Sequence, residues 1–144
     1  MKINFGSLET IFVNKQFSGK YDRPNKLVLM EYDGIPNTEI IKEGIEKIIS
    51  YAHKNAVITT VTNLTAMKGA FTSVNSYFKE RFTPAMQALG RKYAVMISSN
   101  DPFTKYAINT ISSYAPTMGV ELISVSSIQA CEEWLSKQKE YEGV

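Results

Sequence analysis

Two adjacent hydroxyl residues, Thr72 and Ser73, stand where a loop enters a predicted helix in the stretch GAFTSVNSYF, residues 69–78. A hydroxyl at a helix start accepts a hydrogen bond from a backbone N–H two or three residues further along the chain. A phosphate group there would lie at the positive end of the helix dipole, so the position also tolerates modification. The pair is therefore a candidate switch, and plain helix capping is the interpretation that we favour.

The side chains that most often carry catalysis are sparse in this sequence. His53 is the only histidine, and it lies near the end of a predicted helix without the cysteine or carboxylate neighbours that a zinc site needs. The sequence has no G-x-S-x-G nucleophile turn and no glycine-rich phosphate loop. A role for His53 as a catalytic base would require a partner within hydrogen-bond reach. We therefore predict a protein that is not an enzyme and holds no cofactor or metal.

The single cysteine, Cys131, cannot form a disulfide within the chain. It lies three residues after Ile128 and four before Leu135, which places it on the buried stripe of a predicted helix. A thiol in apolar surroundings stays protonated and unreactive. The prediction is a structural thiol, in a chain that suits a thiol-reducing compartment.

Length and charge narrow the class of protein. The chain has 144 residues, which fits a single domain over residues 1–144 with one core. Its net charge of +2 is too small to indicate nucleic acid as a partner. No apolar run approaches the ~18 residues that span a bilayer, and the first residues lack the long apolar stretch of a signal peptide. We expect a cytoplasmic protein without an integral membrane segment.

Hydrophobic periodicity predicts the elements that would position these residues. Two strand-like runs, 9–17 and 26–34, favour an antiparallel hairpin joined by a long loop at 18–25. Helical and β-branched segments then alternate: a helix at 37–55, a strand at 56–64, a helix from Thr72 to Gly90, a strand at 91–99, a helix from Asp101 to Pro116, a strand at 120–125 and a helix at 127–135.

This order predicts an α/β fold, a mixed sheet with an N-terminal antiparallel hairpin followed by βαβαβα units. Strands that alternate with helices pair in parallel through right-handed crossovers. Because the strands are apolar on both sides, helices must cover both faces of the sheet. Within the second helix, the pair Thr83-Pro84 removes a backbone hydrogen bond and predicts a kink or a split.

Aromatic residues gather on the second and third predicted helices. Tyr77, Phe78 and Phe82 lie on the second, and Phe103 and Tyr106 lie on the third. Aromatic side chains dominate ordinary cores, but two aromatic helices side by side could also border an apolar pocket or form a dimer face. Core, pocket and interface all stay open at this point.

Two segments carry a resemblance to a known family. VELISVSSIQACEEWL, residues 120–135, looks like its final strand, turn and helix, where an alanine and a closing Trp-Leu recur. RKYAVMISSNDPF, residues 91–103, looks like the preceding strand and helix start. On these segments the chain resembles the SpoIIAA-like branch of the STAS superfamily, the group that contains bacterial anti-sigma-factor antagonists. The resemblance covers roughly residues 27–136 and implies a STAS-like single domain.

The resemblance implies a non-catalytic regulatory or protein-interaction module. In regulatory STAS domains, a partner kinase phosphorylates a serine or threonine at the start of the helix after the central strand. Ser73, or alternatively Thr72, stands in that place, although the aspartate that normally precedes it is absent. The expected partner is a protein, with a homodimer as an open alternative.

A second function follows from the outline of the fold, which resembles the CRAL-TRIO lipid-binding proteins. The alternative is therefore a carrier of a lipid or small apolar ligand, with a pocket between the second and third helices. The aromatic residues of those two helices would line it.

Overall fold

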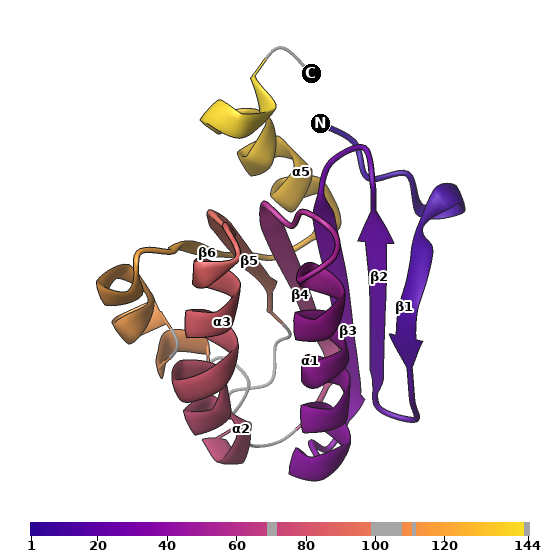
Figure 1. The fold of residues 1–144 in the computed structure, drawn as a ribbon, viewed down its shortest axis with the longest axis vertical. Coiled ribbons are helices and arrows are strands. Elements are labelled where there is room, and N and C mark those ends of the chain that lie inside the picture. The colour runs from indigo at the N-terminus through magenta and orange to yellow at the C-terminus, as the bar shows by residue number, and fades with distance from the viewer. Residues whose placement is uncertain (69–71, 99–107, 111, 143–144) are drawn as a thin grey trace.

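A six-stranded mixed sheet forms the centre of the molecule (Figure 1). The computed structural model describes residues 1–68, 72–98, 108–110 and 112–142. Strand order across the sheet follows the order along the chain, from β1 at one edge to β6 at the other. The strands are β1 (Glu9–Val13), β2 (Phe17–Asp22), β3 (Leu27–Gly34), β4 (Thr59–Met67), β5 (Tyr93–Ile97) and β6 (Glu121–Val125).

The sheet is antiparallel on its N-terminal side and parallel on the other. β2 pairs antiparallel with both β1 and β3. From β3 to β6 each neighbouring pair is parallel. The chain must therefore return over one face of the sheet after each strand, to the end where the next strand begins. The predicted α/β fold, with N-terminal antiparallel strands followed by parallel ones, is confirmed.

The predicted loop at 18–25 is wrong, because most of it is strand β2. Phe17, Gly19 and Tyr21 are buried at alternate positions of this strand. The segment therefore has the two-residue burial period of a strand, although it is rich in turn-forming residue types. The first hairpin turn lies earlier, where Asn14 Oδ1 accepts a hydrogen bond from the backbone N–H of Phe17 at 2.8 Å. The N-terminal region therefore contributes three strands instead of two.

A close approach of helix α1 (Thr38–Ala52) explains the glycine within β2. A Cβ atom at Gly19 would lie 2.5 Å from Ile48 Cδ1, and one at Gly44 would lie 2.3 Å from Phe17 Cδ1. Both distances are far shorter than a carbon–carbon contact. At both positions the absence of a side chain allows the helix and the strand to pack closely, and the glycine does not form a turn.

The remaining helical segments follow the parallel strands. They are α2 (Thr72–Tyr77), a π-helical turn (Phe78–Phe82), α3 (Thr83–Ala88), the helical residues 108–110 and 112–114, and α5 (Ile128–Ser136). Short 3₁₀ turns also occur in the described residues, at Phe5–Ser7, Ala115–Met118 and Lys139–Tyr141.

The π-helical turn separates α2 from α3 where the sequence predicts a kink or a split. The backbone N–H of Thr83 bonds to the carbonyl of Phe78, five residues earlier. Pro84 follows in the first turn of α3, where its missing N–H costs least. The second helix is therefore divided by a change of helix type.

Helices cover both faces of the sheet, as predicted. On one face α1 and the segment from α2 to α3 pack in a core that contains Met30, Ile45 and Phe78. On the opposite face α5 packs in a second core that contains Val61 and Leu135. Figure 1 shows α1, α2 and α3 side by side, with α5 at the other end of the molecule.

Candidate functional site

The carboxyl ends of β3 and β4 lie at the edge of the sheet where α2 begins (Figure 1). The backbone N–H of Lys68 donates to the carbonyl of Gly34 at 2.9 Å, which ties the two strand ends together. Ligand sites in parallel sheets favour this edge. We call it the C-terminal edge.

The candidate switch residues belong to the first turn of α2 at this edge. The helix begins at Thr72, with Ser73 as its second residue. Their backbone position therefore agrees with the helix start that the sequence predicts. Their side chains lie outside the described part of the structure, so the choice between cap and phosphorylation site stays a prediction.

A cleft of about 330 Å³ lies at the same edge, between the β1–β2 turn and the ends of β3 and β4. We call it the rim cleft. Its volume is in the range of small-ligand sites. Its polar lining includes Asn14, Gln16, Ser18, Glu31, Asp33 and Asn63.

Hydrogen bonds hold the wall of the rim cleft that the β1–β2 turn forms. The Asn14 side chain donates to the carbonyl of Ile40 in α1 at 2.9 Å, while its oxygen accepts from the turn itself. The Gln16 side chain donates to the carbonyl of Ile35 at 2.5 Å and accepts from the N–H of Asn37 at 2.8 Å. The wall is therefore fixed by side chains that already have partners.

The opposite wall combines a carboxylate, an amide and a hydroxyl. Asn63 Nδ2 donates to Glu31 Oε2 at 3.4 Å, and Asn63 Oδ1 accepts from Thr65 Oγ1 at 2.7 Å. Glu31 pairs with Asn63, but the next pair is Asp33 with Ala66, so β4 carries an extra residue here. A bulge of this kind redirects side chains at a sheet edge.

Exposed apolar side chains flank the rim cleft. Val13 lines it and is 57% exposed, and Ile35, joined to Gln16 as described above, is 73% exposed. Protein interfaces combine hydrogen bonds with apolar contacts. The polar walls of the cleft and the apolar side chains beside it offer both. This cleft was not predicted from the sequence, although polar residues at alternate positions in β3 and β4 were the available signal.

Tyr77, one of the predicted pocket or interface residues, joins α2 to α1. Its hydroxyl donates to Glu46 Oε2, and Arg81 donates to both oxygens of the same carboxylate at 3.0 and 2.8 Å. Burial, assisted by the bond to Glu46, raises the pKa of Tyr77 to about 12. The hydrogen bond from Arg81 in turn lowers the pKa of Glu46. The cluster fixes the two helices against each other.

Phe78 and Phe82 belong to the core. They are 3% and 1% exposed, and their rings pack edge to face with centroids 5.3 Å apart. The cavity beside them measures about 20 Å³, which is far too small for a lipid. Phe103 and Tyr106 lie outside the described residues. The lipid-carrier alternative therefore gains no support.

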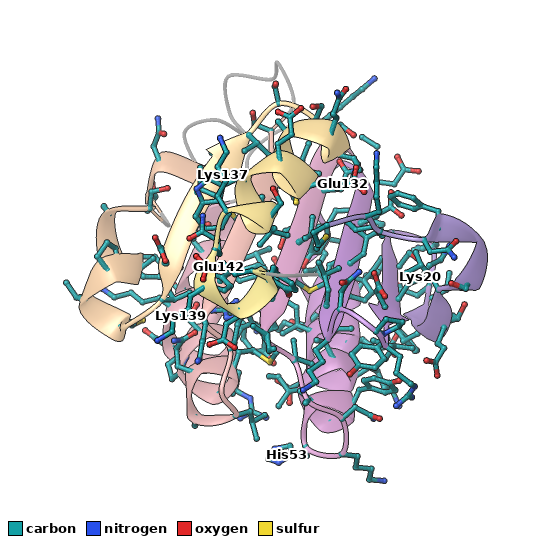
Figure 2. All side chains as sticks on the ribbon, turned by 90° about the horizontal axis from the view of Figure 1, so that it is seen from above. Lys20, His53, Glu132, Lys137, Lys139 and Glu142 are labelled. Atoms are coloured by element: carbon teal, nitrogen blue, oxygen red, sulfur yellow. The ribbon has the colours of Figure 1, made fainter. Side chains whose placement is uncertain are left out.

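The other predicted chemical groups lie apart from one another. His53 is the exposed C-cap of α1, and Figure 2 shows it at the periphery, distant from the other labelled residues. Cys131 is fully buried, and burial raises the pKa of its thiol to about 12. Across residues 1–68, 72–98, 108–110 and 112–142, no three His, Cys, Asp or Glu side chains are grouped to hold a metal. None of the helices in these ranges has the length and apolarity of a membrane span.

Solved structures contain a counterpart of this architecture. The chain is similar to the anti-sigma factor antagonist SpoIIAA in its unphosphorylated form, with a TM-score of 0.57. The chain has a SpoIIAA-like fold. The superposition covers 92% of this chain and 100% of the other, with 13% identical residues, so the likeness concerns the fold. No family model matches the sequence, and no curated protein matches it.

Proposed function

We propose that this protein is a non-catalytic regulatory module that binds a protein partner at the C-terminal edge of its sheet. The observation that carries the proposal is the meeting of two features at that edge of a SpoIIAA-like fold. One is the start of α2 at Thr72, and the other is the rim cleft. A partner that covers this edge would contact both.

The chemistry of the described residues supports binding over catalysis. The polar side chains that line the rim cleft carry carboxylates, amides, hydroxyls and the ammonium group of Lys15, and the lining contains no histidine or cysteine. All of these groups form hydrogen bonds readily, and the hydroxyls would need an activating base to act as nucleophiles. The Val13 and Ile35 side chains add apolar contact area.

Regulation would act through the first turn of α2. A phosphate on Ser73 or Thr72 would add negative charge and three acceptor oxygens at the edge where the partner binds. In the proposal, phosphorylation changes the affinity for the partner, while the fold keeps its stability because a helix start tolerates negative charge.

Affinity capture with lysine cross-linking tests the proposal. The full chain and the variants Ser73→Glu, Thr72→Glu and Ser73→Ala serve as baits, with Ser50→Glu on the exposed side of α1 as a matched control. We expect one partner with the wild type, Ser73→Ala and Ser50→Glu, and at least about a tenfold loss with a phosphate mimic, which corresponds to about 1.4 kcal/mol. Cross-links should involve Lys15 or Lys68, which are exposed at the C-terminal edge.

Two outcomes would contradict the proposal. A partner whose cross-links map only to Lys137 and Lys139, near α5, would place the interface elsewhere. A chain that is strictly monomeric by light scattering and captures no partner would remove the interaction role, because a homodimer is then excluded as well.

A further inference from the structure

One positively charged side chain lies inside the molecule without an acidic partner. Arg91 follows α3 and is 5% exposed. Within the described part of the chain, no carboxylate lies at ion-pair distance from its guanidinium. Burial lowers the pKa of Arg91 to about 10, so the group keeps its charge at neutral pH. A buried charge is costly unless an opposite charge or a full set of hydrogen bonds compensates it.

Neutral groups orient the Arg91 guanidinium. Its Nε donates to Gln87 Oε1 at 3.0 Å, and its Nη1 donates to Thr60 Oγ1 at 2.9 Å. The ring centroid of Phe82 lies 5.3 Å from its Cζ. These two bonds use two of the five N–H donors that a guanidinium has. They supply no negative charge.

A small cavity adjoins Arg91 beneath the π-helical turn. It measures about 20 Å³, and Phe78 and Phe82, the two ends of that turn, both line it. Thr62 and Thr83 also line it, and each is 4% exposed. A water-sized particle needs roughly 10–15 Å³ of such volume, so the cavity has room for one small particle.

We propose that this cavity binds one monovalent anion of halide size, such as chloride, between the Arg91 guanidinium and the hydroxyls of Thr62 and Thr83. The anion supplies the negative charge that the side chains around Arg91 lack. Hydroxyl and guanidinium N–H groups are the donors that such an ion needs. The rest of the lining is Thr60 and the apolar side chains of Phe78, Phe82, Ala94, Met96, Val120 and Leu122.

A hydroxyl near Arg91 is a further buried polar group in this region, and it lacks a partner among the described residues. Tyr114 Oη is buried and has no hydrogen-bond partner among the residues that the structure describes. Burial raises the pKa of Tyr114 to about 12, and the charge of Arg91 opposes that shift, so the two groups lie within each other's field. Few buried polar atoms in native proteins lack a partner.

Binding would connect the second helical segment to the sheet. Thr83 begins α3, whereas Thr60 and Thr62 belong to β4. An anion held from both sides stabilises the packed arrangement, because a ligand that binds only the folded state raises its stability by mass action. The segment that carries Thr72 and Ser73 would then be anchored more firmly at its far end.

Thermal unfolding of the full chain in different sodium salts tests the proposal. At neutral pH and matched ionic strength, we expect the Tm to be about 3 °C higher in chloride or bromide than in gluconate. The difference should saturate with halide concentration. It should vanish in Arg91→Met and persist in Lys54→Met, which removes a lysine exposed to solvent. Crystals grown in bromide should show an anomalous peak in the cavity.

A second variant keeps the test decisive if Arg91→Met fails to fold. Thr83→Val removes one hydroxyl but preserves the size of the side chain and the buried cation, and it should reduce the difference in Tm between halide and gluconate. Equal Tm values in all three salts, with no anomalous peak, would mean that only water occupies the cavity and would overturn the proposal. A halide effect that is unchanged in Arg91→Met or Thr83→Val would overturn it too.

Discussion

Neighbouring residue pairs on one face of the sheet lie in opposite environments. Leu29 pairs with Val61, and two residues further along the same strands Glu31 pairs with Asn63. Leu29 and Val61 are 1% and 0% exposed in the core that α5 covers. Glu31 and Asn63 are partly exposed and line the rim cleft. We call the region around Leu29 and Val61 the covered end of this face, and the region around Glu31 and Asn63 its open end. The two pairs are only two residues apart along each strand.

The difference shows how one pair of strands serves both stability and binding. At the covered end, apolar burial in the core that β3 and β4 share with α5 anchors both strands. Beyond this core the same strands continue and carry the polar side chains that line the rim cleft. A site on rigid strands is held more accurately than one on a free loop.

The largest expected contrast between the two ends is in thiol reactivity. A Ser18→Cys variant carries one thiol in the rim cleft and a second, the native Cys131, on the buried side of α5. We expect two phases with a disulfide reagent, with rates that differ by a factor of about 10³ or more, because Cys131 reacts only after opening. Absorbance of the released thiolate measures both phases. One fast phase that consumes both thiols would show that the covered end is open to solvent.

Side-chain truncation should also distinguish the two ends, through the loss in the free energy of unfolding. Leu135→Ala removes buried methyl groups from the core under α5, and we expect a loss of about 2–5 kcal/mol in the free energy of unfolding. Glu31→Ala, at the open end, should cost about 0.5 kcal/mol, because the hydrogen bond that Glu31 accepts from Asn63 is long and partly exposed. Denaturant titration measures both values. Similar losses would mean that Glu31 contributes to the core as much as Leu135.

The sequence predicts the covered end better than the open end. Periodic apolar residues placed Cys131 and Leu135 on a buried helical face, and both are fully buried. Outside the covered end, the helix start at Thr72 and the division of the second helix near Pro84 were also predicted, because both depend on local chemistry. Such features depend on residues close together along the chain.

Features that join distant segments were not predicted. β2 was interpreted as a loop because Gly19 looks like a turn residue, and only its contact with Ile48 shows the need for glycine. The rim cleft depends on the pairing of Glu31 with Asn63, which periodicity alone does not give. Nothing in the sequence distinguishes the buried Arg91 from its exposed neighbour Lys92.

The turn at the open end offers a smaller and more local test. Asn14→Ala removes the hydrogen bonds that its side chain makes with the turn and with α1. We expect a loss of about 1 kcal/mol in the free energy of unfolding and faster hydrogen exchange at the amides of Gln16 and Phe17. Lys15→Ala is the matched control, since Lys15 is exposed in the same turn. Unchanged exchange in Asn14→Ala would show that the turn is held by its backbone alone.

The smallest expected effect lies on the opposite face, where an ion pair joins α1 to the segment after α2. The hydrogen bond from Arg81 lowers the pKa of Glu46 in the folded state. Its stabilising contribution is therefore present above the unfolded value of about 4.3 and is lost as the pH falls through the folded value. Because both side chains are more than 40% exposed, solvent screening limits the contribution to about 0.5 kcal/mol. Denaturant titrations from neutral pH down to about pH 3 should show a smaller acid-induced loss in Glu46→Gln than in the wild type. The control Glu80→Gln, which changes an exposed carboxylate in the π-helical turn, should follow the wild type. Identical pH profiles for Glu46→Gln and the wild type would mean that the helices are held together by their apolar contacts, and the sheet would then be stabilised in the same way on both faces.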